Sequence, residues 1–160
     1  MRRDLQKTQV IRKSQTPIIS KGMLRPDVHF LRCPIKASMG VFGRKWTTLI
    51  LRDIGFRKID RFNNLIESVP GLTPRVLSMR LKELEKDGII QKTEDETSPT
   101  VVRWTLTEKG IDALPILMRL MAFGSKWYAD EVFEDKVPRS LNEIFTKPEA
   151  QAIVQRLYQA

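Results

Sequence analysis

The stretch RFNNLIESVPGLTPRVLSMRLKELEKDGIIQKTEDETSPTVVRWTLTEKG, residues 61–110, decides the fold of this chain. Apolar residues recur at helical spacing from Phe62 to Val69, directly after Asp60, whose carboxylate is a common type of helix cap. Pro70 and Gly71 favour a turn that ends this helix. The beginning of the stretch therefore predicts a short helix and a turn.

A second helix is predicted over residues 73–87. Thr73 can cap its first turn, and Pro74 occupies the first helical position, where a missing N–H costs nothing. Asp87 and Gly88 are expected to end it. One face of this helix is apolar and should pack, and the other is mostly cationic and free: Leu77, Leu81 and Leu84 against Arg75, Met79, Lys82 and Lys86.

Two strands and a polar turn follow the second helix. Residues 89–93 and 101–106 are rich in β-branched and aromatic side chains, whereas residues 94–99 are polar, so a hairpin is predicted. Thr107 is expected to cap a further helix, with Glu108 near its positive N-terminal end. The pattern predicts a mainly α fold with a small β-ribbon (α+β), a winged helix-turn-helix, which is a shape that reads DNA.

Further helices are predicted on both sides of the motif. Residues 34–42 and 44–54 should form two helices before it, and a long helix should run from about Thr107 to Ala129 with more apolar surface than so small a core needs. The expected core residues are Trp46, Leu49, Ile50, Ile54, Phe62, Leu65, Leu77 and Leu81. The expected parts are a basic arm (1–28), the winged domain with its long helix (29–130) and a short helical extension (131–160).

Length and composition exclude several classes of protein. The chain has 160 residues, 41% of them hydrophobic, which suffices for one compact domain with appended segments. The apolar run 114–124 is too short to span a bilayer, and the N-terminus lacks the apolar core of a secretory signal, so a cytoplasmic protein without membrane contact is expected. Cys33 and His29 are the one cysteine and the one histidine, too few for a protein-only zinc site. Since no nucleophile-base pair, phosphate loop or carboxylate dyad occurs, we expect no cofactor and no enzymatic activity.

A net charge of +9 points to an acidic partner. Residues 1–25 supply +6 of this charge, which fits either a solvated tail or an arm that contacts DNA phosphates. The other relevant cations gather around the motif: Arg44, Lys45, Arg57, Lys58, Arg61, Arg75, Arg80 and Lys82. This distribution predicts that double-stranded DNA contacts the chain at the helix-turn-helix, where these cations form a local footprint.

Three separated signatures carry a family resemblance: CPIKASMGVFGRKWTTLILRD from residue 33, RFNNLIESVPGLTPRVLSMRLKELEKDGII from residue 61 and VRWTLTEKG from residue 102. Over residues 33–127 the chain resembles the HxlR-type transcriptional regulators, a branch of the MarR-like winged-helix proteins. The resemblance implies a homodimer paired by the N-terminal and long C-terminal helices, with one winged helix in the major groove of each operator half-site. The dimer interface that it implies contains Leu114, Leu117, Leu120, Met121 and Tyr128.

Roles on DNA follow as hypotheses. The N-terminal turns of helix 73–87 should reach base edges, so the candidates for base readout are Thr73, Arg75, Ser78 and Met79. Arg75 leads because a guanidinium can donate two hydrogen bonds to guanine, the alternative being a solvated surface charge. Phosphate contacts are assigned to Lys45, Arg61, Asn63 and Lys82, and at the wing to Lys92 and Arg103.

The wing departs from the family pattern. Relatives usually carry an arginine shortly before the second strand, where this chain has Thr100, Val101 and Val102, and the loop contains three acidic residues at 94–96. Because phosphate repels an acidic tip, we do not expect the wing to insert into DNA. The basic N-terminal arm can supply phosphate contacts in place of the wing.

Cys33 raises a second functional question. It stands at a predicted helix N-terminus near Lys36, an arrangement that favours the reactive thiolate. In some relatives a cysteine directly before this proline is a redox or electrophile sensor, and an unreactive residue at the dimer edge is the alternative. Any regulatory disulfide would have to join two subunits, because the chain has no second cysteine.

A sequence-specific regulator, with repression as the expected output, is the favoured function. A sequence-tolerant architectural nucleic-acid-binding protein would use the same fold and the same basic arm. A winged helix that binds protein fits the cationic helix face less well. The ratio of affinities for operator and random DNA distinguishes regulator from architectural protein. The residues indicate no particular effector ligand.

Overall fold

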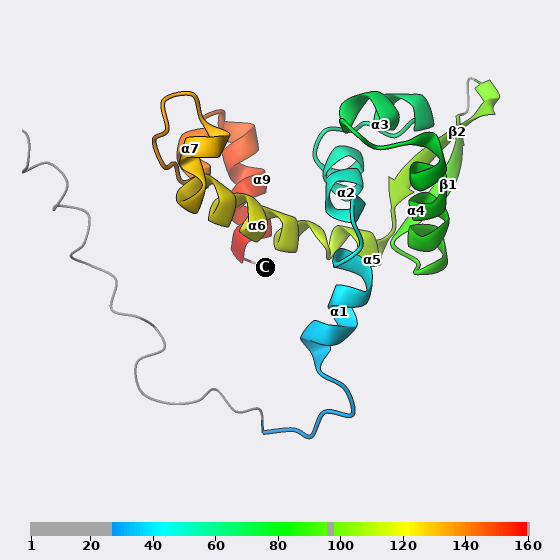
Figure 1. Ribbon diagram of the computed structural model, residues 1–160, viewed down its shortest axis with the longest axis horizontal. Helices are drawn as coiled ribbons and strands as arrows, with labels where there is room; N and C mark the ends of the chain where they lie inside the picture. The colour runs from blue at the N-terminus through cyan, green and yellow to red at the C-terminus, as the bar shows by residue number, and fades with distance from the viewer. Residues whose placement is uncertain (1–26, 96–97, 160) are drawn as a thin grey trace, which may run out of the picture. The chain divides into compact units, whose positions relative to one another are not determined.

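The computed structural model describes residues 27–95 and 98–159, and contacts divide the chain into one unit up to Cys33 and a second from Pro34 (Figure 1). The predicted boundary after residue 28 lies inside the first unit, and most of the predicted basic arm lies outside the described residues. The elements of the second unit are α1 (Pro34–Phe42), α2 (Thr47–Gly55), α3 (Phe62–Ser68), α4 (Pro74–Lys86), β1 (Ile90–Asp95), β2 (Ser98–Leu106), α5 (Glu108–Ile111), α6 (Leu114–Trp127), α7 (Ala129–Val132), α8 (Leu141–Ile144) and α9 (Pro148–Gln159).

Helix α1 has the predicted bounds, but α2 begins at Thr47 and not at residue 44 as predicted. The reason is the backbone of Trp46, whose φ of 76° is left-handed and cannot continue a right-handed helix. Such a conformation costs a bulky residue about 1–3 kcal/mol, so the surrounding contacts must hold it. The Trp46 side chain packs against the core, as predicted.

The helix-turn-helix consists of α3 and α4. The N-cap prediction for Thr73 is confirmed, since its hydroxyl accepts a hydrogen bond from the Val76 N–H at 3.4 Å. The prediction for Asp60 is wrong: the N-cap of α3 is Arg61, which makes no side-chain cap bond, and the Asp60 carboxylate binds elsewhere. Gly88 has a φ of 68°, which lets the chain leave α4 in a conformation that suits glycine.

The core lies between α2, α3, α4 and the ribbon, which Figure 1 shows grouped together. All eight residues predicted for the core belong to it, and Ile50, Leu65 and Leu77 have no exposed surface. Full burial of each such side chain contributes about 1.5–3 kcal/mol to folding. The apolar face of α4 is therefore fixed against the core, and its opposite face points outward.

The ribbon is antiparallel and longer than predicted. Its register pairs Ile90 with Leu106 and continues to Glu94 with Val102, after which a bulge shifts the pairing to Asp95 with Ser98. Residues 94, 95, 98 and 99, predicted as part of the turn, therefore belong to the strands. Residues 96–97 lie outside the described part of the chain, so the prediction about the wing tip stays a prediction.

The segment LTEKG, residues 106–110, connects the end of β2 to the end of α4. The Thr107 hydroxyl accepts from the Gly110 N–H at 3.2 Å, which confirms the predicted cap, and donates to the Gly88 carbonyl at 2.6 Å. Gly110 is buried, and a Cβ there would lie 2.1 Å from the Ile89 carbonyl oxygen. Only glycine permits this close backbone approach.

The helix predicted from Thr107 to Ala129 is divided into α5, α6 and the start of α7. Pro115 stands in the first turn of α6 and lacks the N–H that a continuous helix would need, so the helix starts anew there. A second cluster then joins Met118 of α6 to Leu141 and Val154 of α8 and α9. A capping box between Ser140 and Glu143 opens α8.

Candidate nucleic-acid interface

The outward face of α4 carries the side chains predicted to read DNA. Arg75, Met79 and Lys82 are exposed and follow one another at spacings of four and three residues, so they share one side of the helix. Met79 has 44% of its surface exposed, a large value for an apolar residue in a packed helix pair. The arrangement offers a cation, an apolar side chain and a second cation in line along the helix.

Thr73 and Ser78 are less available for base readout than Arg75 and Met79. Thr73 is exposed, but its hydroxyl oxygen already accepts the cap bond from Val76, which leaves its O–H and one remaining lone pair for DNA. Ser78 is half-buried. Arg75 and Met79 are therefore the more accessible members of the predicted set.

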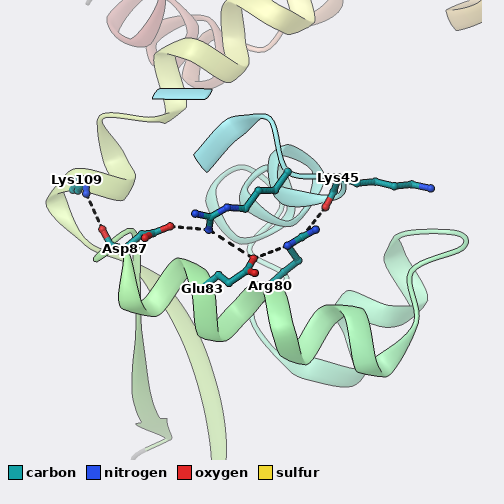
Figure 2. Close-up of polar contacts among 6 residues, drawn as sticks. Lys45, Arg80, Glu83, Asp87 and Lys109 are labelled. Atoms are coloured by element: carbon teal, nitrogen blue, oxygen red, sulfur yellow. Dashed lines mark hydrogen bonds and ion pairs between the residues drawn. The ribbon is translucent and has the colours of Figure 1, made fainter. Parts of the chain in front are cut away.

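Two arginines of the predicted footprint serve the fold itself. Arg44 donates to Asp87 at 2.8 Å and lies 3.6 Å from Glu83, and Arg80 donates to Glu83 at 2.5 Å (Figure 2). Only 16% of the Arg80 side chain is exposed. These contacts fasten the turn after α1 to α4, and a DNA contact by Arg44 or Arg80 stays a prediction.

Lys45 takes part in this network through its main chain, and its side chain does not take part. Its carbonyl accepts a hydrogen bond from Arg80 Nε at 2.9 Å, whereas its side chain extends away from the hydrogen-bonded residues in Figure 2. The Lys45 Nζ lies 4.6 Å from the centre of the Trp46 ring, a cation–π contact. Lys45 is exposed and remains a candidate for phosphate contact.

Arg103, predicted to touch DNA at the wing, pairs with Asp60 instead. Its guanidinium donates to both carboxylate oxygens of Asp60, at 3.0 and 3.1 Å, and the Trp104 N–H donates to the Asp60 carbonyl at 2.9 Å. This bond explains why Asp60 does not cap α3, and it holds β2 against the α2–α3 connection. A phosphate contact by Arg103 would compete with this ion pair, and that contact stays a prediction.

Lys92 is more accessible but is also engaged. Its Nζ lies 3.1 Å from a Glu85 carboxylate oxygen and 5.2 Å from the centre of the Trp104 ring, while 52% of its side chain stays exposed. An exposed pair of this kind contributes little to stability, so phosphate can compete for the lysine. Arg61 and Asn63, the other predicted phosphate contacts, are exposed around the start of α3.

Asp53 is a buried charge that the sequence patterns did not reveal. Burial raises the pKa of its carboxyl, but hydrogen bonds from Arg52, Ser68 and Arg57 more than offset this and keep the pKa below its ordinary value. The donor distances are 2.7, 2.5 and 3.2 Å in that order. Asp53 thus joins the end of α2 to the end of α3, and it binds Arg57 of the predicted footprint, whose side chain stays 51% exposed.

The predicted dimer residues of α6 differ in how much of their surface is exposed. Leu114 and Leu117 are only 9% and 6% exposed and belong to the core of their own chain, so little of either side chain is left for a subunit interface. Leu120 and Tyr128 are exposed, and Met121 packs partly against the second cluster. An apolar stripe, Ile116, Leu120, Phe123 and Trp127, follows one face of α6 at spacings of four, three and four residues. Sequence spacing alone could have found this stripe.

Cys33 is exposed and is the last residue of the first unit of the chain.

Among the described residues, no group of three or more potential ligands could hold a metal ion. Within the same residues, no helix is long and apolar enough to cross a membrane.

Comparison with known proteins identifies the family. Residues 41–132 match the family model described as HxlR-like helix-turn-helix, which covers the motif, the ribbon, α5, α6 and α7. The chain belongs to the HxlR-like helix-turn-helix family. It is a MarR-like winged-helix transcriptional regulator. Helices α8 and α9 lie beyond the matched residues.

Individual relatives agree with this assignment. An uncharacterized HTH-type transcriptional regulator of Synechocystis is 32% identical over 102 residues, which cover 64% of this regulator and 75% of the relative. The uncharacterized HTH-type transcriptional regulator YdeP of Bacillus subtilis is 32% identical over 106 residues, covering 64% and 79%.

Solved structures give the same fold. The reduced form of the regulator YodB from B. subtilis matches with a TM-score of 0.51 and 27% identity, covering 61% of this regulator and 95% of YodB. The redox regulator HypR in its oxidized form matches with a TM-score of 0.52 and 31% identity, covering 57% and 94%.

Proposed function

We propose that this HxlR-type regulator binds a palindromic operator as a homodimer, with α4 of each subunit in the major groove and repression as the output. The outward face of α4 carries the proposal: Arg75, Met79 and Lys82 are exposed there, while Arg44, Arg80 and Arg103 are held by carboxylates of the same chain. A cationic helix face that the fold leaves accessible suits the major groove.

In this complex Arg75 and Met79 contact base edges, with Thr73 and Ser78 beside them. Phosphate contacts come from Lys45, Arg61, Asn63, Lys82 and Lys92, which are all exposed. The phosphate contacts set affinity and register, and the base contacts set the preferred sequence.

The apolar stripe on α6 supports the homodimer. Its members, together with Ile35 and Met39 of α1, expose between 41% and 74% of their surface. Monomeric soluble proteins seldom expose so many large apolar side chains along one helix face as α6 does, since their burial is favourable. A second copy of the chain would cover the stripe, and a two-fold axis would place two α4 helices on one side of the DNA.

Selection of bound fragments from random DNA tests the proposal. We expect a palindrome whose half-sites are about 10 base pairs apart, bound roughly a thousandfold or more tightly than random DNA at the same salt concentration. A reporter gene behind a promoter with the selected site should be less active when the regulator is present. Equal affinity for all fragments would instead identify an architectural nucleic-acid-binding protein.

Cys33 is proposed as a redox-responsive residue of this regulator. Its exposure and the similarity to HypR, named a redox regulator, support the proposal. We expect diamide to produce a disulfide between Cys33 residues of two subunits and to change operator affinity of the wild type, and to leave Cys33→Ser unchanged. Non-reducing electrophoresis and operator binding measure the two effects. An unaltered wild type after diamide would reject the proposal.

A further inference from the structure

Arg80 differs from the other cations of α4 in the direction of its side chain. Arg75, Lys82 and Lys86 are exposed, whereas Arg80 turns toward the connection between α1 and α2 and is largely buried. There its Nε donates to the Lys45 carbonyl at 2.9 Å, and its terminal nitrogen donates to Glu83 at 2.5 Å (Figure 2). One planar guanidinium therefore joins α4 to the main chain of Lys45.

The main chain that Arg80 holds is in an unusual conformation. Trp46 has a φ of 76°, and this angle sets the orientation of the peptide plane that carries the Lys45 carbonyl. The carbonyl accepts from a charged donor, and such hydrogen bonds are stronger than those between neutral groups. Arg44 adds a second attachment of the same turn, to Asp87 at the end of α4. The turn is thus fixed to α4 at two points.

The Lys45 side chain leaves this fixed turn toward solvent. Its ammonium rests 4.6 Å from the centre of the Trp46 ring, and no carboxylate among the described residues forms a salt bridge with it. A long, flexible lysine loses conformational entropy when it binds phosphate, and a fixed main chain reduces what remains to be ordered.

We propose that Arg80 is a positioning residue, which holds Lys45 so that its ammonium meets a DNA phosphate beside the groove that α4 enters. The inference rests on the proposed function of α4. Arg80 itself does not touch DNA in this arrangement, and it acts on binding through Lys45. Affinity for all DNA sequences depends on it, and the choice of sequence does not.

A double-mutant cycle on operator DNA tests the inference with Arg80→Met, Lys45→Ala and the combination. Methionine keeps the apolar stem of Arg80 and removes its donors. The measurement is the slope of log K against log salt concentration, whose magnitude falls by about 0.9 for each phosphate that the protein no longer neutralises, or about 1.8 for a dimer with one such phosphate per subunit. We expect this decrease in each single variant and no further decrease in the double variant.

Three further variants accompany the cycle. Lys82→Ala should lower the slope additively with Arg80→Met, because Lys82 lies outside the network. Lys147→Ala removes one exposed charge before α9 and should leave the slope unchanged. Melting temperatures verify folding, and Arg80→Leu, which also lacks a donor, replaces Arg80→Met if the latter unfolds.

The remaining outcomes overturn the inference in distinct ways. Additive decreases for Arg80 and Lys45, about 3.6 in slope for the dimer, would show that Arg80 contacts phosphate itself. An unchanged slope in folded Arg80→Met, or in Lys45→Ala, would reject the positioning role while wild-type operator binding stands. If the wild type shows no preference for any operator, the proposed function fails first.

Discussion

Replacement of Leu120 and Phe123 by glutamate is expected to leave a folded monomer that binds its operator at least about a hundredfold more weakly than the wild type. Both side chains lie on the apolar stripe of α6, 52% and 55% exposed, so the substitutions bury no charge within the subunit. In a dimer the same carboxylates would be buried in pairs, where desolvation and repulsion act together.

The weaker binding follows from linkage of the two half-sites. When one subunit is bound, the dimer presents its second α4 at a high effective concentration, which raises overall affinity by about 10²–10⁴ without any new interaction. A monomer has no such advantage. Sedimentation measures the oligomeric state, and titration of operator DNA at fixed salt measures the affinity.

Ile153 provides a matched control. It is 57% exposed but stands on α9 and is not a member of the stripe, so Ile153→Glu should remain dimeric and bind normally. A double glutamate variant that stays dimeric with unchanged affinity would show that α6 does not pair the subunits.

Replacement of Arg75 by alanine is expected to cost roughly 1–3 kcal/mol at each operator half-site, hence about 2–6 kcal/mol for the dimer. The loss should concentrate on the cognate operator and relax its base preference, because a guanidinium reads guanine through two hydrogen bonds. Folding should be unaffected, since Arg75 is exposed in the first turn of α4. Competition between operator and point-substituted operators measures the change in preference.

Lys82→Ala on the same helix face supplies the comparison for Arg75. Removal of a phosphate contact should weaken binding to all sequences alike, without altering the preferred bases. If Arg75→Ala weakens every sequence equally, Arg75 is also a phosphate contact and base readout belongs to other residues. If it changes nothing, Arg75 is a solvated surface charge.

Local signals predicted much of the fold because their physics acts within a few residues. Thr73 and Thr107 cap helices through bonds to N–H groups three residues later, and both are visible in the sequence. The capping rule gave a wrong prediction where a residue distant in the sequence competed for the capping group. Asp60 has the chemistry of a cap, but Arg103, 43 residues away, binds its carboxylate.

At the candidate site, local sequence signals likewise do not distinguish exposed cations from those held by ion pairs. Arg75 and Arg80 stand on one helix with similar sequence surroundings, and composition assigns both to a cationic footprint. The structure separates them, because Glu83 and the Lys45 carbonyl hold Arg80 while Arg75 remains exposed. Likewise, the apolar residues of α6 share a helical period, but only tertiary packing tells Leu117 in the core from Leu120 on the surface.

By itself, the sequence determined the winged helix-turn-helix, its capped helices and the apolar face of α4, since periodicity and capping are properties of neighbouring residues. Only the tertiary structure decided which cations and which apolar side chains remain exposed. Arg44 and Asp87 are also 43 residues apart, and no periodicity connects them. Ion pairs and burial of this kind arise only when the folded chain brings distant residues within a few ångströms.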